Sequence, residues 1–294
     1  MNYNAYKYAL ISVFLWSTVA TAFKYSLQYL SPAQLVLFAS FTSLIILFIV
    51  LLFQKKLNLA LNHIKENSFH ILILGAINPF LYYLVLFKAY SLLSAQEAQA
   101  INYTWALMLS FLSVPLLKQK LTLADIVAGI ICYFGVLIIS TKGEPFSLNF
   151  TDLEGVGYAL ISTVLWALYW IFNTKSKADA VISLFSNFLF ALPMIILYVY
   201  FTEDFIFPET NGFLAAIYVG FFEMGITFLF WLKAMQTAQN TSKIANLIFI
   251  SPFLSLIFIH FILKEPIFIS TLFGLVFIIF GLIFQQKFMN NYSK

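Results

Sequence analysis

The sequence contains no arginine, and only 10% of its 294 residues are charged. A soluble globular protein has about 25% charged residues, so this chain lacks the polar side chains that would cover its surface in water. Without arginine it also lacks a bidentate group for phosphate, which disfavours a phosphorylated, strongly anionic ligand. The net charge of +4 is a small basic excess. The composition therefore excludes a soluble enzyme, a disordered chain and a nucleic-acid partner.

Cysteine and catalytic motifs are equally scarce. Cys132 is the single cysteine and lies in an apolar run, which excludes a disulfide framework and a cysteine-based metal site. The three histidines are scattered, and HExxH, GxSxG and GxxxxGKS/T motifs are absent from the sequence. We therefore expect no catalytic residue, no metal and no cofactor. An intramembrane enzyme, the alternative, would need paired Ser/His or Glu/His groups at membrane depth, which the spacing does not supply.

Apolar residues make up 62% of the chain, and its mean hydropathy is +0.92. A helix needs about 20 apolar residues to cross a hydrocarbon core of about 30 Å. Ten such runs occur, and they cover residues 7–29, 32–53, 69–91, 96–117, 122–141, 154–174, 181–201, 212–235, 243–263 and 267–286. The runs are continuous and do not alternate as barrel strands would. The sequence thus predicts an all-α integral membrane protein with ten transmembrane helices.

The connections between these runs are short, the longest being residues 54–68 and 142–153. No small-residue cleavage site follows the first run, so we expect it to be a span and not a signal peptide. With the N-terminus inside, 12 of the 16 lysines lie on the inner side. Because positive charge concentrates in cytoplasmic loops, both termini are expected in the cytoplasm of a bacterial inner or plasma membrane.

A segment of the first run recurs 150 residues later. Tyr8–Trp16 reads YALISVFLW and Tyr158–Trp166 reads YALISTVLW, with seven of nine residues identical. Two shorter pairs follow in the same order, Lys88-Ala89 with Lys233-Ala234 and Lys118-Gln119 with Lys264-Glu265. The chain thus divides into two halves, residues 1–145 and 146–294, with five spans each. Because five is odd, the second half enters the membrane from the opposite side, as in the inverted repeats of many secondary transporters.

The repeat comes with longer stretches that carry a family resemblance. Each half has a tryptophan in its first helix, residues 15–32 read LWSTVATAFKYSLQYLSP, and residues 264–281 read KEPIFISTLFGLVFIIFG. Over its whole length the chain resembles the EamA-type permeases of the drug/metabolite transporter superfamily. Residues 101–105, INYTW, are similar to the NYLWP stretch of the aromatic amino-acid exporter branch. The resemblance implies alternating access to a small organic metabolite, with an amino acid or related solute as best candidate and export favoured.

Polar and aromatic residues far from the span ends are candidates for the transport pathway. Glu223 lies about 16 Å into the eighth run at ~1.5 Å per residue. A charge at that depth is costly and usually functional, so Glu223 is expected to pair with a substrate amine or to exchange a proton. The alternative is a protonated Glu hydrogen-bonded to a neighbouring helix. Thr227 and Trp231 follow at spacings of four and eight, on the same helical face.

The other candidates lie in the first, third, fourth and sixth runs. The predicted pathway residues are Trp16, Asn78, Tyr82, Asn102, Tyr103, Trp105, Trp166, Glu223, Thr227 and Trp231. For Trp16 and Trp166 the alternative is plain packing. For Asn78, which precedes Pro79, it is a kink with an interhelical hydrogen bond.

The expected partners are a small-molecule substrate and membrane lipid, for a monomer or a homodimer. Four glycines in the fifth and tenth runs, Gly129, Gly135, Gly274 and Gly281, permit close helix contact, either within the chain or at a dimer face. A sensor or assembly subunit without transport remains the alternative function. Such a sensor would normally carry a soluble output module, for which the chain has no room.

Overall fold

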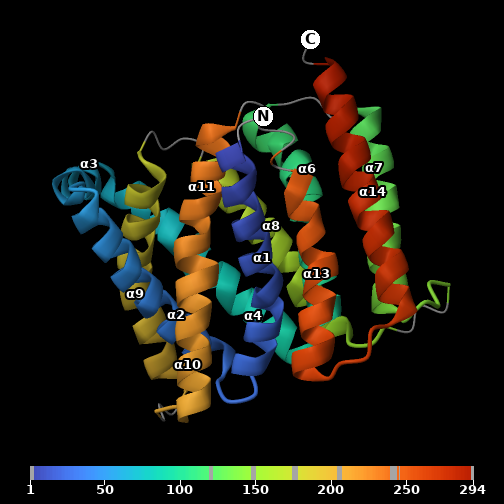
Figure 1. Cartoon of the computed structure of the whole chain (residues 1–294), viewed down its shortest axis with the longest axis horizontal. Helices are drawn as coiled ribbons and strands as arrows, with labels where there is room; N and C mark the ends of the chain where they lie inside the picture. Colours follow the sequence, from blue (N-terminus) through green and yellow to red (C-terminus); the bar gives the residue numbers. More distant parts are fainter. Residues whose placement is uncertain are drawn as a thin grey trace.

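The computed structural model describes residues 3–118, 122–146, 150–173, 178–203, 207–238, 244 and 246–292, and these residues contain helices but no β-strand. The first half comprises α1 (Tyr3–Ser26), α2 (Pro32–Phe53), α3 (Leu57–Gly75), the π-helix η1 (Ala76–Leu81), α4 (Tyr82–Leu92), α5 (Ala95–Asn102), α6 (Trp105–Leu117) and α7 (Leu123–Ser140). The second half comprises α8 (Leu153–Asn173), α9 (Ala180–Thr202), α10 (Thr210–Tyr218), the π-helix η2 (Val219–Ile226), α11 (Thr227–Thr237), η3 (Asn246–Ile250), α13 (Ser251–Phe258), η4 (Ile259–Leu263) and α14 (Ile269–Tyr292). Both chain ends lie at the same end of the helical bundle (Figure 1).

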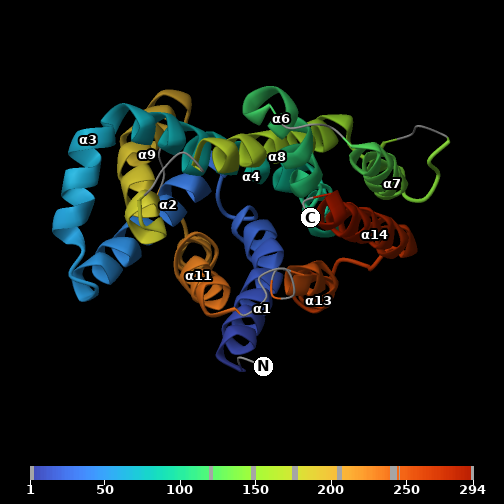
Figure 2. The same cartoon turned by 90° about the horizontal axis from the view of Figure 1, so that it is seen from above.

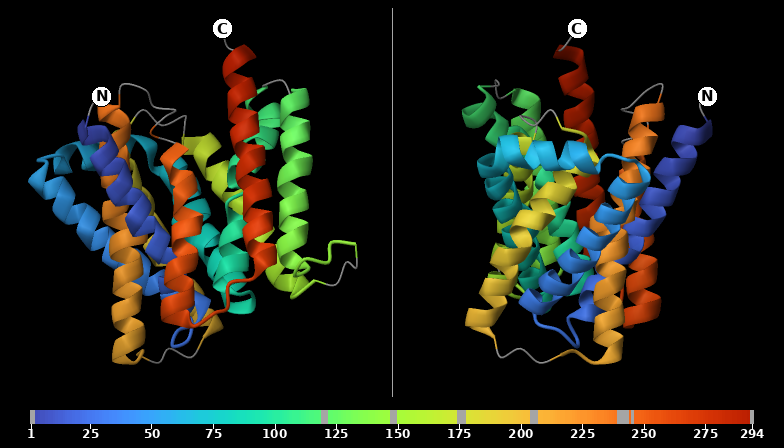
Figure 3. Two further views of the ribbon diagram at one scale, coloured as in Figure 1. Left: turned by 45° about the vertical axis from the view of Figure 1, so that its right-hand side comes forward. Right: turned by 90° about the vertical axis from the view of Figure 1, so that its left-hand side faces the viewer.

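Eight continuous helical segments of the described chain are long and apolar enough to cross a membrane, and two shorter apolar helices, Leu247–Leu263 and Ile269–Gln285, follow them. Each of these segments overlaps one of the ten predicted runs. Several long segments are composite, because α10, η2 and α11 follow one another along a single line through the bundle (Figure 3). Gln119, Lys243 and the end of the sixth run at residue 174 lie outside the described residues.

The connection predicted over residues 54–68 is mostly helical. Only Gln54–Lys56 separate α2 from α3, which begins at Leu57 and kinks at Asn67 (φ −127°, ψ 20°). The polar residues of this segment interrupt the apolar run, although apolar side chains recur at helical spacing. One of them, Ala60, is fully buried. The hydropathy pattern therefore placed the start of this helix too late.

Three helices begin with a reciprocal capping box. Ser31, Ser94 and Thr122 each accept a hydrogen bond from the backbone N–H three residues later, at the starts of α2, α5 and α7. In each case the side chain of that third residue bonds back to the capping residue. These capping boxes satisfy N–H groups that would otherwise lack partners at the helix ends. They explain why the helices begin at these positions.

Helices of the two halves interleave instead of forming two separate bundles. α1 packs against α11 and α13, whereas α8 packs against α4 and α6. In addition, α2 packs on α9 and α7 packs on α14. Since the repeated YALIS segment relates α1 to α8, each helix has neighbours in the other half that occupy equivalent positions. From above, α3 and the α7–α14 pair lie on opposite sides of the molecule (Figure 2).

Close contact between α7 and α14 depends on glycine. A Cβ atom on Gly135 would lie 2.6 Å from the Gly274 carbonyl oxygen, and one on Gly281 would lie 2.6 Å from the Cys132 sulfur. Gly129 faces the ring of Phe111 in α6 instead. All of these contacts are within the chain, so the glycines pack helices together inside one molecule, as expected of small residues in membranes.

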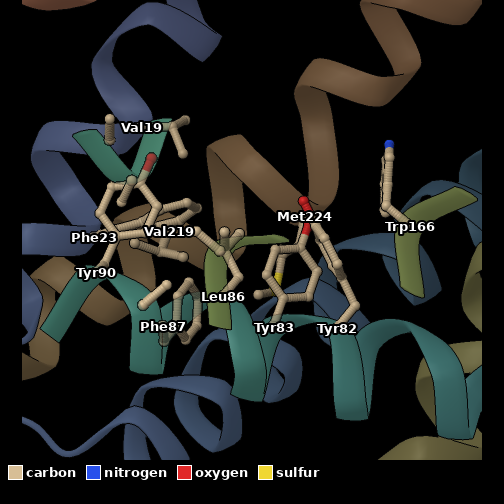
Figure 4. Close-up of a cluster of buried hydrophobic side chains, with 14 of the residues drawn as sticks. Val19, Phe23, Tyr82, Tyr83, Leu86, Phe87, Tyr90, Trp166, Val219 and Met224 are labelled. Atoms are coloured by element: carbon tan, nitrogen blue, oxygen red, sulfur yellow. The ribbon is translucent and has the colours of Figure 1, made fainter. Parts of the chain in front are cut away.

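Aromatic side chains of α4 fill much of the centre. Tyr83, Phe87 and Tyr90 are at most 3% exposed and project toward α1 and the η2 region (Figure 4). The Phe23 ring of α1 lies 4.8 Å from that of Phe87 and 5.2 Å from that of Tyr90. Val219 of η2 packs in the same cluster. This cluster packs α4 against α1 and η2 near the centre of the molecule.

Candidate functional site

A cavity of about 430 Å³ lies between helices of both halves. Its walls come from α1, α4, α5, α6, α8, η2, α11, η3 and α14. The lining is mainly aromatic and aliphatic. It consists of Trp16, Val19, Ala20, Phe23, Tyr82, Leu86, Tyr90, Gln99, Asn102, Tyr103, Trp105, Ala106, Leu109, Trp166, Trp170, Glu223, Phe228, Trp231, Met235, Ile248, Phe249 and Leu282.

All five tryptophans of the chain line this cavity. The Trp16 ring lies 5.5 Å from Phe228 and 5.4 Å from Trp231, measured between ring centroids. Trp166 stacks on Tyr82 at 4.6 Å and lies 6.4 Å from the same Phe228. Trp16 and Trp166, which occupy matching positions in the repeated sequence segment, therefore both lie near Phe228 in one aromatic wall.

Glu223 is the one charged residue among the described residues that line the cavity. It lies in η2, midway along the segment Thr210–Thr237. The Tyr83 hydroxyl donates a hydrogen bond of 3.2 Å to Oε1 of Glu223. Tyr83 itself is 1% exposed, so the carboxyl group lies between a buried phenol and the cavity. No lysine of the described chain contributes to the lining, which leaves the acid without a countercharge there.

Two of the ten predicted pathway residues, Asn78 and Thr227, lie outside the cavity lining. Each was placed with a partner four residues away, Asn78 with Tyr82 and Thr227 with Glu223. Both pairs include a π-helical segment, in which backbone hydrogen bonds join residues five apart. The helix winds more slowly there, so residues four apart no longer share a face. In each pair one residue lines the cavity and the other packs between helices.

Asn78 packs between helices. It is 3% exposed, it has a non-helical backbone (φ −142°, ψ 121°), and it lies beside Tyr169 of α8. Asn187 of α9 donates to the same Tyr169 hydroxyl at 3.4 Å. Nearby, a Cβ atom on Gly75 would lie 2.6 Å from the Asn187 carbonyl oxygen, so the backbones of α3 and α9 touch. Asn78 thus belongs to a polar contact between helices.

The predicted fourth span is broken where its candidate residues cluster. α5 ends at Asn102, two turn residues follow, and α6 begins at Trp105. Asn102, Tyr103 and Trp105 all line the cavity. The Asn102 amide donates a 3.0 Å hydrogen bond to Ser162 Oγ of α8, which holds the break against the repeated YALIS segment.

Some lining residues were missed by the sequence reasoning. Tyr90 lies eight residues after Tyr82, and Trp170 lies four after Trp166, so helical spacing could have identified both. Phe228 offered no comparable signal, because the chain has 35 phenylalanines and their number hides the one between the two tryptophans.

Side-chain to backbone hydrogen bonds join neighbouring segments at the end of the bundle remote from the termini. The Lys24 ammonium donates to the carbonyl oxygens of Tyr90 at 2.8 Å and Leu93 at 2.6 Å, at the last turn of α4. The carboxylate of Glu265 accepts from the Ala95 N–H at 3.1 Å, at the start of α5. Lys24 is therefore engaged with backbone and does not serve the cavity as a free cation. The second contact joins one half of the chain to the other.

Comparison with known proteins agrees with this arrangement. The chain is 22% identical to an uncharacterized transporter of Archaeoglobus fulgidus over 92% of this chain and 95% of that protein. It is 23% identical to the uncharacterized transporter YyaM of Bacillus subtilis, over 92% and 90% of the two chains. A solved crystal structure shares the fold with a TM-score of 0.69, at 17% identity over 99% of both chains.

The family comparison covers both halves. The EamA-like transporter family matches residues 4–141 and matches again over residues 153–285. Together with the apolar helices, these matches identify an integral membrane protein and a membrane transporter or permease. The chain belongs to the EamA-like transporter family.

Proposed function

We propose that this protein is a secondary transporter that moves a small organic metabolite across the cell membrane by alternating access. The best candidate is an amino acid or a related amine-bearing solute, and export is the favoured direction. One observation carries the proposal: a cavity between the two halves joins a single carboxylate, Glu223, to an aromatic wall. Its volume of about 430 Å³ falls in the range of small-molecule sites, about 300–1,000 Å³.

Glu223 is the proposed point of contact with the substrate. A carboxyl group this far from either end of its helix is expensive to keep charged, and such residues generally serve function. An amine entering the cavity would supply the countercharge that the protein lacks there. In its absence a proton could take that place, so substrate and proton would compete for one group. Transport coupled to proton exchange follows from this competition.

An inverted repeat is the proposed basis of the movement. The exchanged neighbours of α1 and α8 and the two family matches support it. Lys118 and Lys264, which the sequence pairs, both adopt the left-handed conformation at helix ends, with φ of 56° and 59°. Lys55 and Lys142 share this conformation at two further helix ends, so the repeat rests mainly on the sequence match and on the two family matches.

The orientation gives each end of the bundle a proposed role. With both termini in the cytoplasm, the contacts of Lys24 and Glu265 lie on the outer side and close it. The cavity reaches Met235, two residues before the end of α11 on the side of the termini. Opening to the outside would require the outer contacts to break.

Flux measurements in liposomes test the proposal. The purified protein, reconstituted with a panel of labelled amino acids, amines and other small metabolites, should move at least one solute faster than protein-free liposomes. Counterflow of the same solute would show that the movement is carrier-mediated. If a folded sample moves no solute of the panel, the transport proposal is contradicted and a sensor or assembly subunit is favoured.

Cysteine labelling tests the orientation. In a Cys132→Ser background, cysteines at the exposed positions Glu209 and Glu144 should react with an impermeant thiol reagent added outside cells. A cysteine at Lys56 should react only after the membrane is permeabilised. The reverse pattern would contradict cytoplasmic termini and exchange the two proposed gates.

A further inference from the structure

The cavity combines a dense aromatic lining with one acid and no basic residue of the described chain. We propose that it selects organic cations: solutes with a charged amine attached to an apolar or aromatic body and without a carboxylate of their own. This rests on the proposed transport function and narrows its solute from amino acids and related amines to amines that carry no carboxylate. Among amine-bearing solutes, the site would prefer a simple amine to the zwitterionic amino acid of the same shape.

Aromatic rings are the first part of the argument. The Trp166 ring lies 6.4 Å from Trp105 and 5.9 Å from Trp170, and in both pairs the rings are nearly perpendicular, at 89° and 88°. Both contacts are edge-to-face, so the three indole rings take different orientations in the lining of one cavity. The negative face of an indole attracts a cation within about 6 Å, and clusters of such rings recognise ammonium groups. All five tryptophans of the chain meet at this one cavity.

Glu223 is the second part. Its Oε1 accepts one hydrogen bond, from Tyr83 at 3.2 Å, and within the described chain no other partner engages the carboxylate. The group is therefore available to pair with a cation in the cavity. A buried charge without a partner is unfavourable, so an incoming ammonium group would be held by both the acid and the rings.

The carboxylate of a zwitterion would meet neutral donors such as Gln99 and Tyr103, but no basic residue of the described chain lines the cavity to balance its charge. Lys24 of α1, a helix that lines the cavity, is bound to two backbone carbonyls at the end of α4. Asn102 already donates to Ser162 at 3.0 Å. A second carboxylate in the cavity would instead face Glu223, and like charges in a desolvated site repel strongly. The same reasoning disfavours anions altogether.

Tryptophan fluorescence provides a direct readout, because every tryptophan lines the cavity. The purified protein in nanodiscs is titrated with four ligands of one shape: 2-phenylethylamine, phenylalanine, 3-phenylpropionate and 2-phenylethanol. Excitation that selects tryptophan keeps the ligands silent. We expect the amine to change the emission with a Kd at least ten times lower than that of phenylalanine, and 3-phenylpropionate to bind most weakly.

Glu223→Gln supplies the matched variant. It should weaken binding of the amine about tenfold or more and leave 2-phenylethanol within about twofold, since the neutral alcohol does not use the charge. If the variant does not fold, the wild-type ligand series decides alone. Phenylalanine binding as tightly as the amine would overturn the inference and leave the transport proposal standing. Failure of the amine to bind, with flux of another solute in liposomes, would also overturn it. Absence of both binding and flux would contradict both proposals.

Discussion

The two π-helical breaks, η1 and η2, stand at equivalent places in the two halves. The offset of 145 residues that relates Lys88 to Lys233 also relates Asn78 of η1 to Glu223 of η2. The same offset relates Gly75 to Gly220. Added Cβ atoms at these glycines would collide with backbone oxygen of α9 and α2, respectively. A helix broken at a glycine contact with its neighbour is therefore present in both halves.

The chemistry at the two breaks differs. At η2 the carboxyl group of Glu223 lines the cavity, whereas at η1 the amide group of Asn78 packs beside Tyr169. π-helical segments often occur at functional sites. Their wider hydrogen-bond spacing changes the direction of the following side chains and can kink the helix. The comparison indicates that the backbone form is shared by the halves, while the specific chemistry belongs to the second half alone. Substitutions of packing residues should therefore lower stability, whereas substitutions of cavity residues should change transport.

The largest expected difference is between a packed ring and a cavity ring. Phe87→Ala removes a side chain with 0% exposure and should cost about 3–5 kcal/mol, so most of the protein should be lost from the membrane. Trp16→Ala opens into existing space, so its yield should stay near wild type while its flux changes. Quantitative yields and flux per folded molecule check both. Equal loss of yield and flux for Trp16→Ala would place it with the packing residues.

The glycine pair tests the shared backbone. Gly75→Ala and Gly220→Ala should each destabilise the protein by about 1–3 kcal/mol, because the methyl group meets a neighbouring backbone that cannot easily move. Thermal unfolding in detergent measures the loss. As a control, Gly157→Ala adds a methyl group with no atom within 4 Å and should be tolerated. Wild-type stability for either Gly75→Ala or Gly220→Ala would show that the two glycine contacts are not equivalent.

Asn78→Ala should act on stability rather than transport. It removes a buried amide next to Tyr169, and the loss of one buried hydrogen-bonding group costs about 1 kcal/mol. The melting temperature should fall slightly, while flux per folded molecule should remain near wild type. A selective loss of flux at normal stability would show that Asn78 serves transport, as the sequence predicted.

The smallest effect is expected at an ion pair between the halves. Lys56 Nζ lies 2.8 Å from Asp179 Oδ2 at the start of α9. Burial raises the pKa of Asp179, but hydrogen bonds from Lys56 and the Val181 N–H outweigh it and hold the pKa below the usual value. The pair therefore stabilises the protein at neutral pH, and this contribution is lost as the pH falls through the lowered pKa.

Because both side chains are about one-third exposed, with 32% accessible for each, the contribution should be at most about 1 kcal/mol. Lys56→Ala should lower the melting temperature slightly at pH 7. The difference from wild type should shrink below about pH 4, where an unpaired aspartate is also protonated. A difference that does not depend on pH would show that the ion pair is not its cause.

Much of the fold followed from the sequence. Continuous apolar runs located the helices, because a membrane-spanning helix must be apolar over its whole length. The start of α3 at Leu57 was missed, since its polar residues end the apolar run although the helix continues. Interleaving of the halves was also beyond the sequence, because a repeat shows equivalence but not which helices pack together.

The candidate site was less predictable. Mid-span depth singled out Glu223 and four of the five tryptophans, because buried polar and large aromatic groups are unusual there, and the structure places these residues at one cavity. Asn78 and Thr227 lie outside the cavity lining, since α-helical spacing does not hold across η1 and η2. No sequence signal marks those π-helical segments beyond the proline at position 79 and the glycines at 75 and 220. Local backbone form, which depends on helix contacts, decided which residues face the cavity.

The central claim is that Glu223 serves transport and not packing. Flux of the transported solute in proteoliposomes, measured across pH for wild type and Glu223→Gln, tests it most directly. Glu209→Gln, which removes an exposed acid just before α10, is the matched control. The account predicts that Glu223→Gln folds normally, loses at least about tenfold in flux per folded molecule or loses its pH dependence, and that the control behaves as wild type. Wild-type flux with an unchanged pH profile in Glu223→Gln would contradict it.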